Sequence, residues 1–231
     1  MAELLCEVSK GVAVLTLNRP QVRNALSASL RHELRLAIQR LDDDVEARVI
    51  VLTGADPAFC SGVDLDELRS GAPQAELGPL ARPFIMSRTP LIGAINGAAY
   101  TGGLELLLAC HFVIASDRAT FADTHARLGV IPGWGLSVLL AEAIGLRRAR
   151  EMALSSQPID ARTAEMWGLV NCVVPHDRLL QEAVSIAAAI AANDVVAVLR
   201  LSQLFDDQAA VSRDACWSLE TQAWMGSSVI G

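Results

Sequence analysis

Two residues with acid–base side chains occupy unusual places in this sequence. Glu105 lies in the apolar run "GGLELLLAC", two residues after Gly103, where the pattern predicts that a helix begins. The helix dipole favours a carboxylate in the first turn, and partial burial raises a carboxyl pKa toward the range useful for general acid–base catalysis. His125 lies in the polar gap of "ATFADTHARLGVIPGWG", between a strand-like run and a turn rich in glycine and proline. Both side chains could move protons, although a helix-start acid and a polar loop residue are the simpler interpretations.

Two turns in the sequence would present free backbone N–H groups. The first, in "LTGADPAFCSGVDLDEL", leads from a strand into Ser61–Val63, and Asp64 is placed to cap the short helix that follows. The second, in "AINGAAYTGGLE", leads from a strand into Gly102–Gly103. N–H groups at a helix start have no intrahelical partner, so two such turns facing one another would form an oxyanion hole. Either turn alone is also explained by ordinary turn geometry, and neither has the GxGxxG or GxxxxGK pattern of a phosphate-binding loop.

Other candidate nucleophiles and bases lack a recognisable arrangement. The sequence has no Gly-x-Ser-x-Gly motif, and Cys60 and Cys110 have no histidine at a spacing that indicates a dyad, although His111 adjoins Cys110. His32 falls on the predicted outer face of a helix, and His176 adjoins a charged helix start. Both histidines are therefore predicted to be surface residues.

The hydrophobic pattern predicts an α/β protein in which the unit strand, strand, helix recurs and helices dominate after Pro132. Ser27 is placed to cap the first long helix, and Arg69–Pro90, with four prolines and two glycines, is predicted to be a long loop. Strands are predicted at Val12–Asn18, Arg48–Gly54, Leu91–Asn96, His111–Ser116, Ala119–Asp123 and Leu169–Pro175, and helices from Gly102, Ser137, Arg147, Asp160 and about Pro175.

Composition narrows the class of protein. The 231 residues are 52% apolar and carry a formal charge of −7 with no run of Lys or Arg, so neither nucleic acid nor an anionic membrane surface is expected as the main partner. Five scattered cysteines without metal-site spacing, and an N-terminus unlike a signal peptide, predict a cytoplasmic protein without a bound metal. The apolar run Pro90–Ser116 contains Glu105 and is divided by glycines, so no membrane span is expected.

Four motifs carry a resemblance to a known family. "LNRPQVRNALS", "AFCSGVDLDEL", "INGAAYTGGLELLLACHFVIAS" and "FADTHARLGVIPGWG" occur in family order, so the chain resembles the enoyl-CoA hydratase/isomerase, or crotonase, superfamily over nearly its whole length. The resemblance implies a ClpP-like spiral of ββα units over residues 1–190 and a C-terminal helical trimerisation region over 191–231, shorter than is usual. It also implies a homotrimer or a hexamer of two trimers, an acyl-CoA substrate, and no cofactor beyond the coenzyme A of that substrate.

The resemblance also implies roles for particular residues. The backbone N–H groups of Val63 and Gly102 would hold the thioester oxygen, and Glu105 matches the first of the two glutamates that activate water in hydratases. The position of the second glutamate falls on His125. Residues implied to line the substrate site are Arg23, Ala25, Leu26, Ser61, Asp64, Leu65, Gly103, Pro132 and Gly133.

Three functions follow from this pattern. The first is hydration of a 2-enoyl-CoA, with Glu105 as the principal base and His125 accepting or delivering the second proton. The second keeps the oxyanion hole but isomerises, decarboxylates or hydrolyses the thioester. The third is a catalytically weak acyl-CoA-binding protein, which the replacement of a glutamate by His125 and the short C-terminal region would both favour. Further departures from the family pattern are Thr101 for glycine, Asp66 for lysine and His111 for aspartate.

Overall fold

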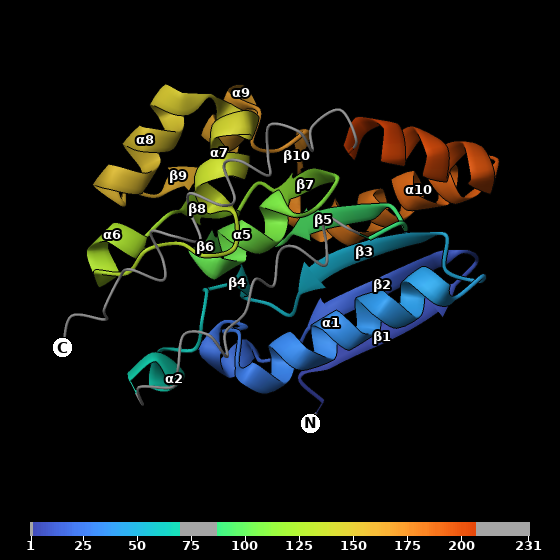
Figure 1. The fold of residues 1–231 in the computed structure, drawn as a ribbon, viewed down its shortest axis with the longest axis horizontal. Helices are drawn as coiled ribbons and strands as arrows, with labels where there is room; N and C mark the ends of the chain where they lie inside the picture. The colour runs from blue at the N-terminus through green and yellow to red at the C-terminus, as the bar shows by residue number, and fades with distance from the viewer. Residues whose placement is uncertain (1, 70–86, 207–231) are drawn as a thin grey trace.

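The computed structural model describes residues 2–69 and 87–206 (Figure 1). The strands are β1 (Leu4–Ser9), β2 (Val12–Leu17), β3 (Val49–Gly54), β4 (Ala58–Cys60), β5 (Leu91–Ile95), β6 (Ala98–Tyr100), β7 (Phe112–Ser116), β8 (Thr120–Ala122), β9 (Ile159–Asp160) and β10 (Cys172–Val174). The helices are α1 (Ala28–Asp43), α2 (Leu65–Arg69), α5 (Gly102–Leu108), α6 (His125–Leu128), α7 (Leu136–Ile144), α8 (Leu146–Ser155), α9 (Ala161–Trp167) and α10 (Leu179–Ala191), with short 3₁₀ turns at Pro20–Val22 and His176–Arg178. A further helix spans Val195–Asp206.

The strands form two sheets that share the same repeating unit. The large sheet has the order β1-β2-β3-β5-β7-β10, and the small sheet has the order β4-β6-β8-β9. Each of the units β3-β4-α2, β5-β6-α5 and β7-β8-α6 places its first strand in the large sheet and its second in the small one. β3, β5 and β7 pair in parallel, as do β4, β6 and β8. The predicted repetition of strand, strand and helix is therefore confirmed.

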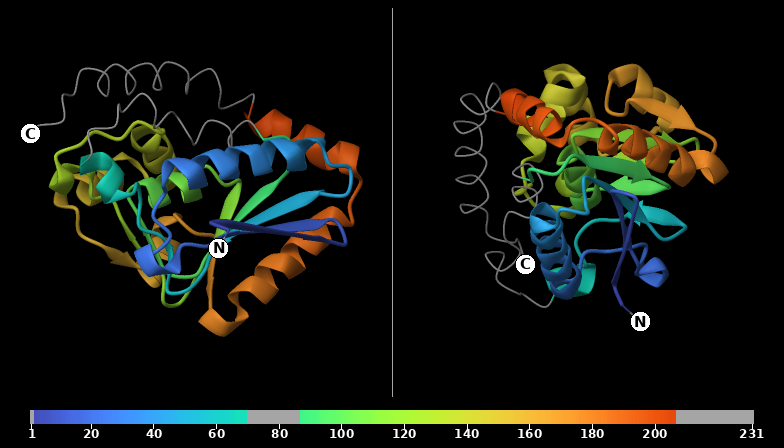
Figure 2. Two further views of the ribbon diagram at one scale, coloured as in Figure 1. Left: turned by 90° about the horizontal axis from the view of Figure 1, so that it is seen from below. Right: turned by 90° about the vertical axis from the view of Figure 1, so that its right-hand side faces the viewer.

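Helices cover both faces of the large sheet (Figure 2). Ile50 and Leu52 of β3 pack in the cluster that contains the buried face of α1, whereas Val49 and Val51 pack with α10. Because both faces are covered, β3 is buried along its whole length and reads as a continuous apolar run. The Ser27 side chain accepts a hydrogen bond from the Leu30 N–H and caps α1, as predicted.

Some local features differ from the predictions. β1, β4, β6 and β9 were not predicted, because three of them have only two or three residues and β1 mixes charged with apolar side chains. His125 is not a loop residue: it begins α6 and is buried. Residues 70–86 of the predicted loop and 207–231 of the predicted trimerisation region lie outside the described residues, so the boundary at residue 190 and the trimer stay predictions.

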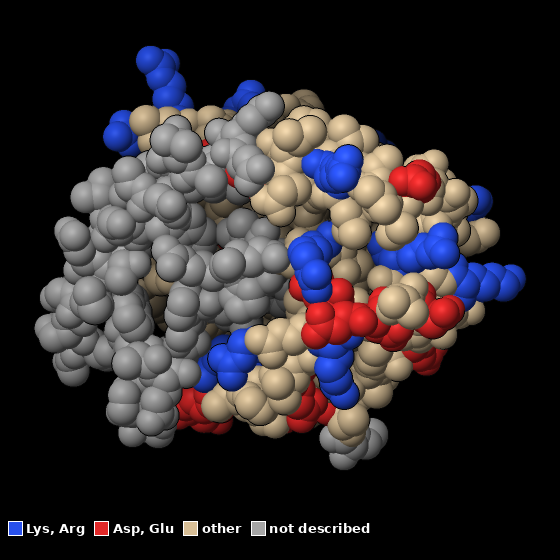
Figure 3. Space-filling model, turned by 45° about the vertical axis from the view of Figure 1, so that its right-hand side comes forward, with Lys and Arg blue, Asp and Glu red and all other residues tan. Residues whose placement is uncertain are grey.

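The apolar run Pro90–Ser116 divides into β5, β6, α5 and β7. Across residues 2–69 and 87–206, no single helix is long and apolar enough to cross a membrane; His176–Ala191 and Val195–Asp206 meet the length and composition test only together, with a bend of 107° between them. On the face drawn in Figure 3, acidic and basic side chains lie beside one another.

At Gly103, α5 makes a close contact with β4, so we expect a side chain added at this position to destabilise the fold. A Cβ atom at Gly103 would lie 2.2 Å from the Cys60 carbonyl oxygen, which is backbone and cannot move aside. We expect Gly103→Ala to lower the free energy of unfolding in urea by about 3 kcal/mol, the upper range for overpacking.

The matched control for this prediction is Gly129→Ala. A Cβ there meets no atom within 4 Å, so only the left-handed φ of 70° penalises the change, at about 1 kcal/mol. An equal loss of unfolding free energy in the two variants would contradict the close contact between Gly103 and the Cys60 carbonyl.

Candidate active site

The turns after β4 and β6 lie side by side. Leu26 forms a parallel bridge to Val63, in which the Leu26 N–H donates to the Gly62 carbonyl at 2.8 Å and the Asp64 N–H donates to the Leu26 carbonyl at 3.2 Å. In such a bridge the Val63 N–H points away from Leu26. A Cβ atom on Gly102 would lie 3.4 Å from the Val63 nitrogen. The N–H of Gly102 is the first of α5 and so has no intrahelical partner, which puts two backbone donors close together.

Thr101 makes the sharp entry into α5. Its backbone has φ 55° and ψ −113°, a conformation that β-branched residues seldom adopt. The Thr101 N–H donates to the Ala122 carbonyl of β8 at 3.0 Å, and its hydroxyl pairs with the hydroxyl of Thr124. These contacts hold a strained backbone at the place where the Gly102 N–H is presented.

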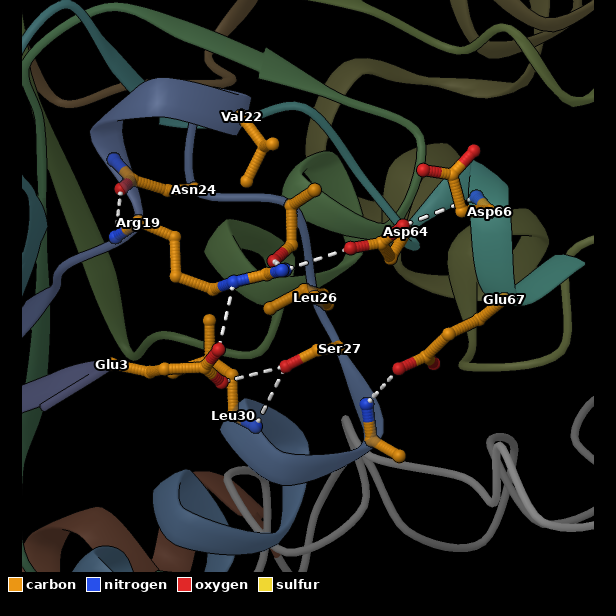
Figure 4. Close-up of polar contacts among 12 residues, drawn as sticks. Glu3, Arg19, Val22, Asn24, Leu26, Ser27, Leu30, Asp64, Asp66 and Glu67 are labelled. Atoms are coloured by element: carbon orange, nitrogen blue, oxygen red, sulfur yellow. Dashed lines mark hydrogen bonds and ion pairs between the residues drawn. The ribbon is translucent and has the colours of Figure 1, made fainter. Parts of the chain in front are cut away.

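Arg19 ties the segment around Leu26 to the turn after β4 (Figure 4). Its Nη1 donates to the Ala25 carbonyl at 2.6 Å and to Asp64 Oδ2 at 2.9 Å, and its Nε lies 3.0 Å from Glu3 Oε1. Asp64 Oδ1 in turn accepts from the Asp66 N–H at 3.1 Å and caps α2, as predicted. Burial raises the Asp64 pKa, but the Arg19 hydrogen bond and charge and the α2 N–H groups outweigh burial and lower it overall. Asp64 is therefore an ionised structural anchor.

A second set of contacts fixes α1 against α2 in the same region (Figure 4). Ser27 Oγ donates to Glu3 Oε2 at 2.7 Å, and Glu67 Oε1 accepts from the Ala28 N–H at 2.7 Å. Arg31 is buried; its Nη1 donates to the Leu26 carbonyl at 2.7 Å and contacts Glu67 at 3.3 Å. The backbone on both sides of Val63 is thus held from α1 and from α2.

A cavity of about 440 Å³ opens beside the two turns. Its lining residues are Val22, Ala25, Ser61, Val63, Asp64, Leu65, Asp66, Thr101, Glu105, Thr124, His125, Leu128, Val130, Ile131, Gly133 and Trp134. The structure thus brings eight of the residues singled out in the sequence to one cavity: Ala25, Ser61, Val63, Asp64, Leu65, Glu105, His125 and Gly133.

Five residues singled out in the sequence do not line the cavity. Gly102 adjoins the Val63 nitrogen and the Trp134 ring, and Gly103 packs on Cys60. Leu26 is buried in the core and acts through its backbone bridge. Arg23 is an exposed residue with φ 52° whose carbonyl accepts from the Ser61 N–H at 3.0 Å, and Pro132 is partly buried between Ile131 and Gly133.

Glu105 is a buried carboxylate with a fixed orientation. Its side chain is 2% exposed, and Oε1 accepts a hydrogen bond from the Trp134 N–H at 3.0 Å. Oε2 lies 3.8 Å from His125 Nε2. The two acid–base residues therefore face each other in the cavity, with one oxygen of Glu105 held by the backbone and the other directed at the imidazole.

Asp123 completes this group and was missed in the sequence. Its Oδ1 lies 2.6 Å from His125 Nδ1 and also accepts the His125 backbone N–H at 3.1 Å. The Asp123 residue is 2% exposed and His125 is 7% exposed. The available signal was the Asp-x-His spacing of "FADTH", which allows an aspartate to accept from the backbone two residues later. Trp134, which orients Glu105, carried no such signal.

The remaining histidines lie apart from the cavity lining. His32 is exposed, as predicted. His176 is not a plain surface residue: Nδ1 lies 3.0 Å from the buried Ser116 hydroxyl, and Nε2 lies 3.2 Å from Asp56 Oδ2. Hydrogen bonding from Asn96, then from His176, lowers the Asp56 pKa against the effect of burial. Within the described residues, no cluster of three His, Cys, Asp or Glu side chains could hold a metal ion.

The thiols of Cys60, which is buried, and Cys110, which is partly buried, give a chemical test of the packing around the site. Burial raises the pKa of Cys60 to about 12, against a smaller opposite effect of the Gly62 N–H, and burial raises the pKa of Cys110 to about 12 as well. Both thiols are protonated below that pH, so only roughly one in 10⁴ is thiolate at pH 8.

We therefore expect iodoacetamide at pH 8 to alkylate the exposed Cys6 in the native protein and to reach Cys60 only after unfolding. Peptide mass spectrometry over a time course measures both rates. If Cys60 in the native protein is labelled as fast as Cys6, Cys60 is not buried, and it becomes a candidate nucleophile again.

Comparisons with known proteins agree with this geometry. The family model "Enoyl-CoA hydratase/isomerase" matches residues 7–225. The chain is 41% identical over 213 residues to a probable peroxisomal enoyl-CoA hydratase 1 of Arabidopsis thaliana, a match that covers 90% of this chain and 80% of the relative. It is 34% identical over 227 residues to the 2,3-dehydroadipyl-CoA hydratase of Escherichia coli, covering 96% of this chain and 89% of the relative.

Solved structures show the same fold. An enoyl-CoA hydratase of Mycobacterium tuberculosis superposes with a TM-score of 0.91 at 44% identity, covering 97% of this chain and 95% of that one. An enoyl-CoA hydratase of Mycobacterium smegmatis gives a TM-score of 0.90 at 43% identity, covering 99% and 100%. The predicted α/β crotonase fold is thus confirmed, and the chain belongs to the enoyl-CoA hydratase/isomerase family.

Proposed function

We propose that this protein is an enoyl-CoA hydratase that adds water across the 2,3-double bond of an acyl-CoA thioester. The observation that carries the proposal is the Glu105–His125 pair, 3.8 Å apart, in the cavity that Val63 lines. Hydratases named among the relatives support the reaction class. The trimer or hexamer implied by the family remains part of the proposal.

The N–H groups of Val63 and Gly102 supply the electrostatic part of the reaction. Water addition at C3 pushes the double-bond electrons onto the thioester oxygen, which becomes an enolate oxygen. Two fixed backbone donors stabilise that negative charge without reorganising, and one such donor is commonly worth about 10² to 10³ in rate. Only the backbone participates, so a valine side chain at position 63 is compatible with the role.

Glu105 and His125 supply the proton transfers. The Trp134 N–H donates to Oε1 of Glu105, and Oε2 lies 3.8 Å from His125 Nε2. A substrate water between the two groups would lose its proton to Glu105 as its oxygen bonds to C3. His125 handles the second proton, the one that C2 gains.

One part of the cavity lining is compatible with an extended carrier attached to the thioester. Ala25, Ser61 and Leu65 give this part of the lining small or apolar surface, and Asp64 is held by Arg19 rather than directed at a ligand. We infer that the pantetheine arm passes between the segment around Ala25 and the start of α2. Asp66 gives this wall no positive charge, so phosphate attraction there is weak.

The proposal predicts hydration of crotonyl-CoA, followed as loss of the conjugated enoyl-thioester absorbance. Glu105→Gln keeps the shape but removes the base, so we expect kcat to fall by about 10² to 10⁴. Glu182→Gln on α10, where the carboxylate pairs at the surface with Arg178, is the matched control and should leave the rate unchanged.

Product analysis by mass spectrometry separates the competing functions. Gain of one water supports hydration, an unchanged mass with a moved double bond indicates isomerisation, and free coenzyme A indicates hydrolysis. Binding of crotonyl-CoA in calorimetry with no product at micromolar enzyme would overturn the enzymatic proposal in favour of an acyl-CoA-binding protein.

A further inference from the structure

We propose that Asp123 is a positioning residue that makes His125 the proton donor of the site. The inference rests on the proposed function, because it assigns the second proton of the hydration reaction. Asp123 follows β8 directly, and one carboxylate oxygen accepts from two groups of the same residue: the Nδ1 of the His125 ring at 2.6 Å and the His125 backbone N–H at 3.1 Å. Ring and backbone are therefore fixed together.

The carboxylate selects the proton position on the ring. A carboxylate only accepts hydrogen bonds, so Nδ1 carries a proton and Nε2 is the nitrogen that faces the cavity and Glu105. A glutamine or asparagine in place of Asp123 could donate instead and would allow the opposite tautomer. Asp123 thus fixes which imidazole nitrogen reaches the substrate.

The surrounding charges decide whether that nitrogen donates or accepts. Asp123 lies on one side of the imidazole and Glu105 of α5 on the other, while Asp66 and Asp64, the latter paired with Arg19, line the same cavity. Arg127, the cation of α6, turns toward α8, where its Nη2 donates to the Ser156 carbonyl at 2.7 Å. Opposite charges within about 4 to 6 Å favour the charged form of a group. Burial of the ring disfavours its charged form, whereas the carboxylates on either side favour it. With Asp123 at 2.6 Å and Glu105 at 3.8 Å, we infer that the two carboxylates outweigh burial, so that His125 enters the reaction as an imidazolium carrying a proton on Nε2.

The proton and electron balance then closes between Glu105, His125 and the substrate. Glu105 takes a proton from water while the water oxygen bonds to C3, and the double-bond electrons move onto the thioester oxygen. The enolate collapses as its electron pair takes the proton from His125 Nε2 to form the C2–H bond. Glu105 is left protonated and His125 neutral, and one proton transfer from Glu105 to His125 restores both. Asp123 stays a carboxylate throughout and never touches the substrate.

The test is Asp123→Asn, which keeps the side-chain shape and removes the charge. We expect kcat for crotonyl-CoA to fall by about 10- to 100-fold, with KM within about twofold, because substrate contacts are unchanged. A donor must be protonated, so activity is lost as pH rises through its titration. Without the Asp123 charge the imidazolium is less favoured, and the basic limb of the kcat–pH profile should move to lower pH.

The matched control is Asp117→Asn. Asp117 is an aspartate on the β7–β8 turn whose Oδ1 accepts from the backbone N–H of a different histidine, His176, at 3.1 Å, and it does not line the cavity. This variant should leave kcat and the pH profile unchanged. In the His125→Gln background, Asp123→Asn should cause little further loss, because a residue that acts only through His125 has nothing left to position.

A measurement without substrate separates this inference from the proposed function. In protein labelled with ¹⁵N-histidine, His125 should show a hydrogen-bonded Nδ1–H proton that is shifted far downfield, assigned by its loss in His125→Gln. Asp123→Asn should abolish that shift. If wild-type protein fails to hydrate crotonyl-CoA while this signal behaves as expected, the proposed function fails and the Asp123–His125 pairing stands. A normal kcat in Asp123→Asn, or movement of the acidic limb instead, overturns the assignment of His125 as donor.

Discussion

Parallel pairing in the small sheet is the constraint on which the site depends. β4, β6 and β8 are parallel neighbours, so the segments that follow them leave the sheet at the same edge. Val63 comes three residues after β4, Gly102 two residues after β6, and His125 three residues after β8. Three strands of only three residues each thereby gather two backbone donors and an acid–base group that are far apart in sequence. The large sheet, buried between α1 and α10, supplies the stability that such short strands cannot.

Burying two carboxylates and an imidazole together costs free energy unless each polar atom is paired. The structure meets this requirement mainly with backbone groups: the Trp134 N–H on Glu105, the His125 N–H on Asp123, and the ring Nδ1 on the same aspartate. Backbone donors do not change charge with pH, so the contacts of Glu105 with Trp134 and of Asp123 with the His125 N–H do not depend on the titration of the donor. Arg19 likewise holds the turn after β4, through its ion pair with Asp64.

The sequence predicts those elements that are long enough to show a hydrophobic repeat or that carry a strong local signal, such as a helix cap. The Ser27 cap, the apolar stripe of α1 and the fully buried β3 carry such signals. The family motifs single out Glu105 and His125, and their side chains lie 3.8 Å apart in the structure. β4 and β6 carry too few residues for periodicity to register, and their pairing depends on contacts between residues about 40 apart in sequence. Trp134 is not predictable because the group that orients Glu105 is its backbone N–H, which every residue but proline has.

Asp123 and His125 are best understood as one unit rather than as a histidine that happens to fill a glutamate position. A glutamate at position 125 would bring its carboxylate toward that of Asp123, which lies 2.6 Å from the present ring, and toward Glu105 on the other side. Three buried carboxylates without a cation repel one another, and at least one would have to take up a proton. The imidazole relieves this repulsion by lying between Asp123 and Glu105. Asp123 therefore requires His125 as its partner, just as His125 requires Asp123 for its position. The departure from the two-glutamate pattern retains an acid and a base in the same cavity.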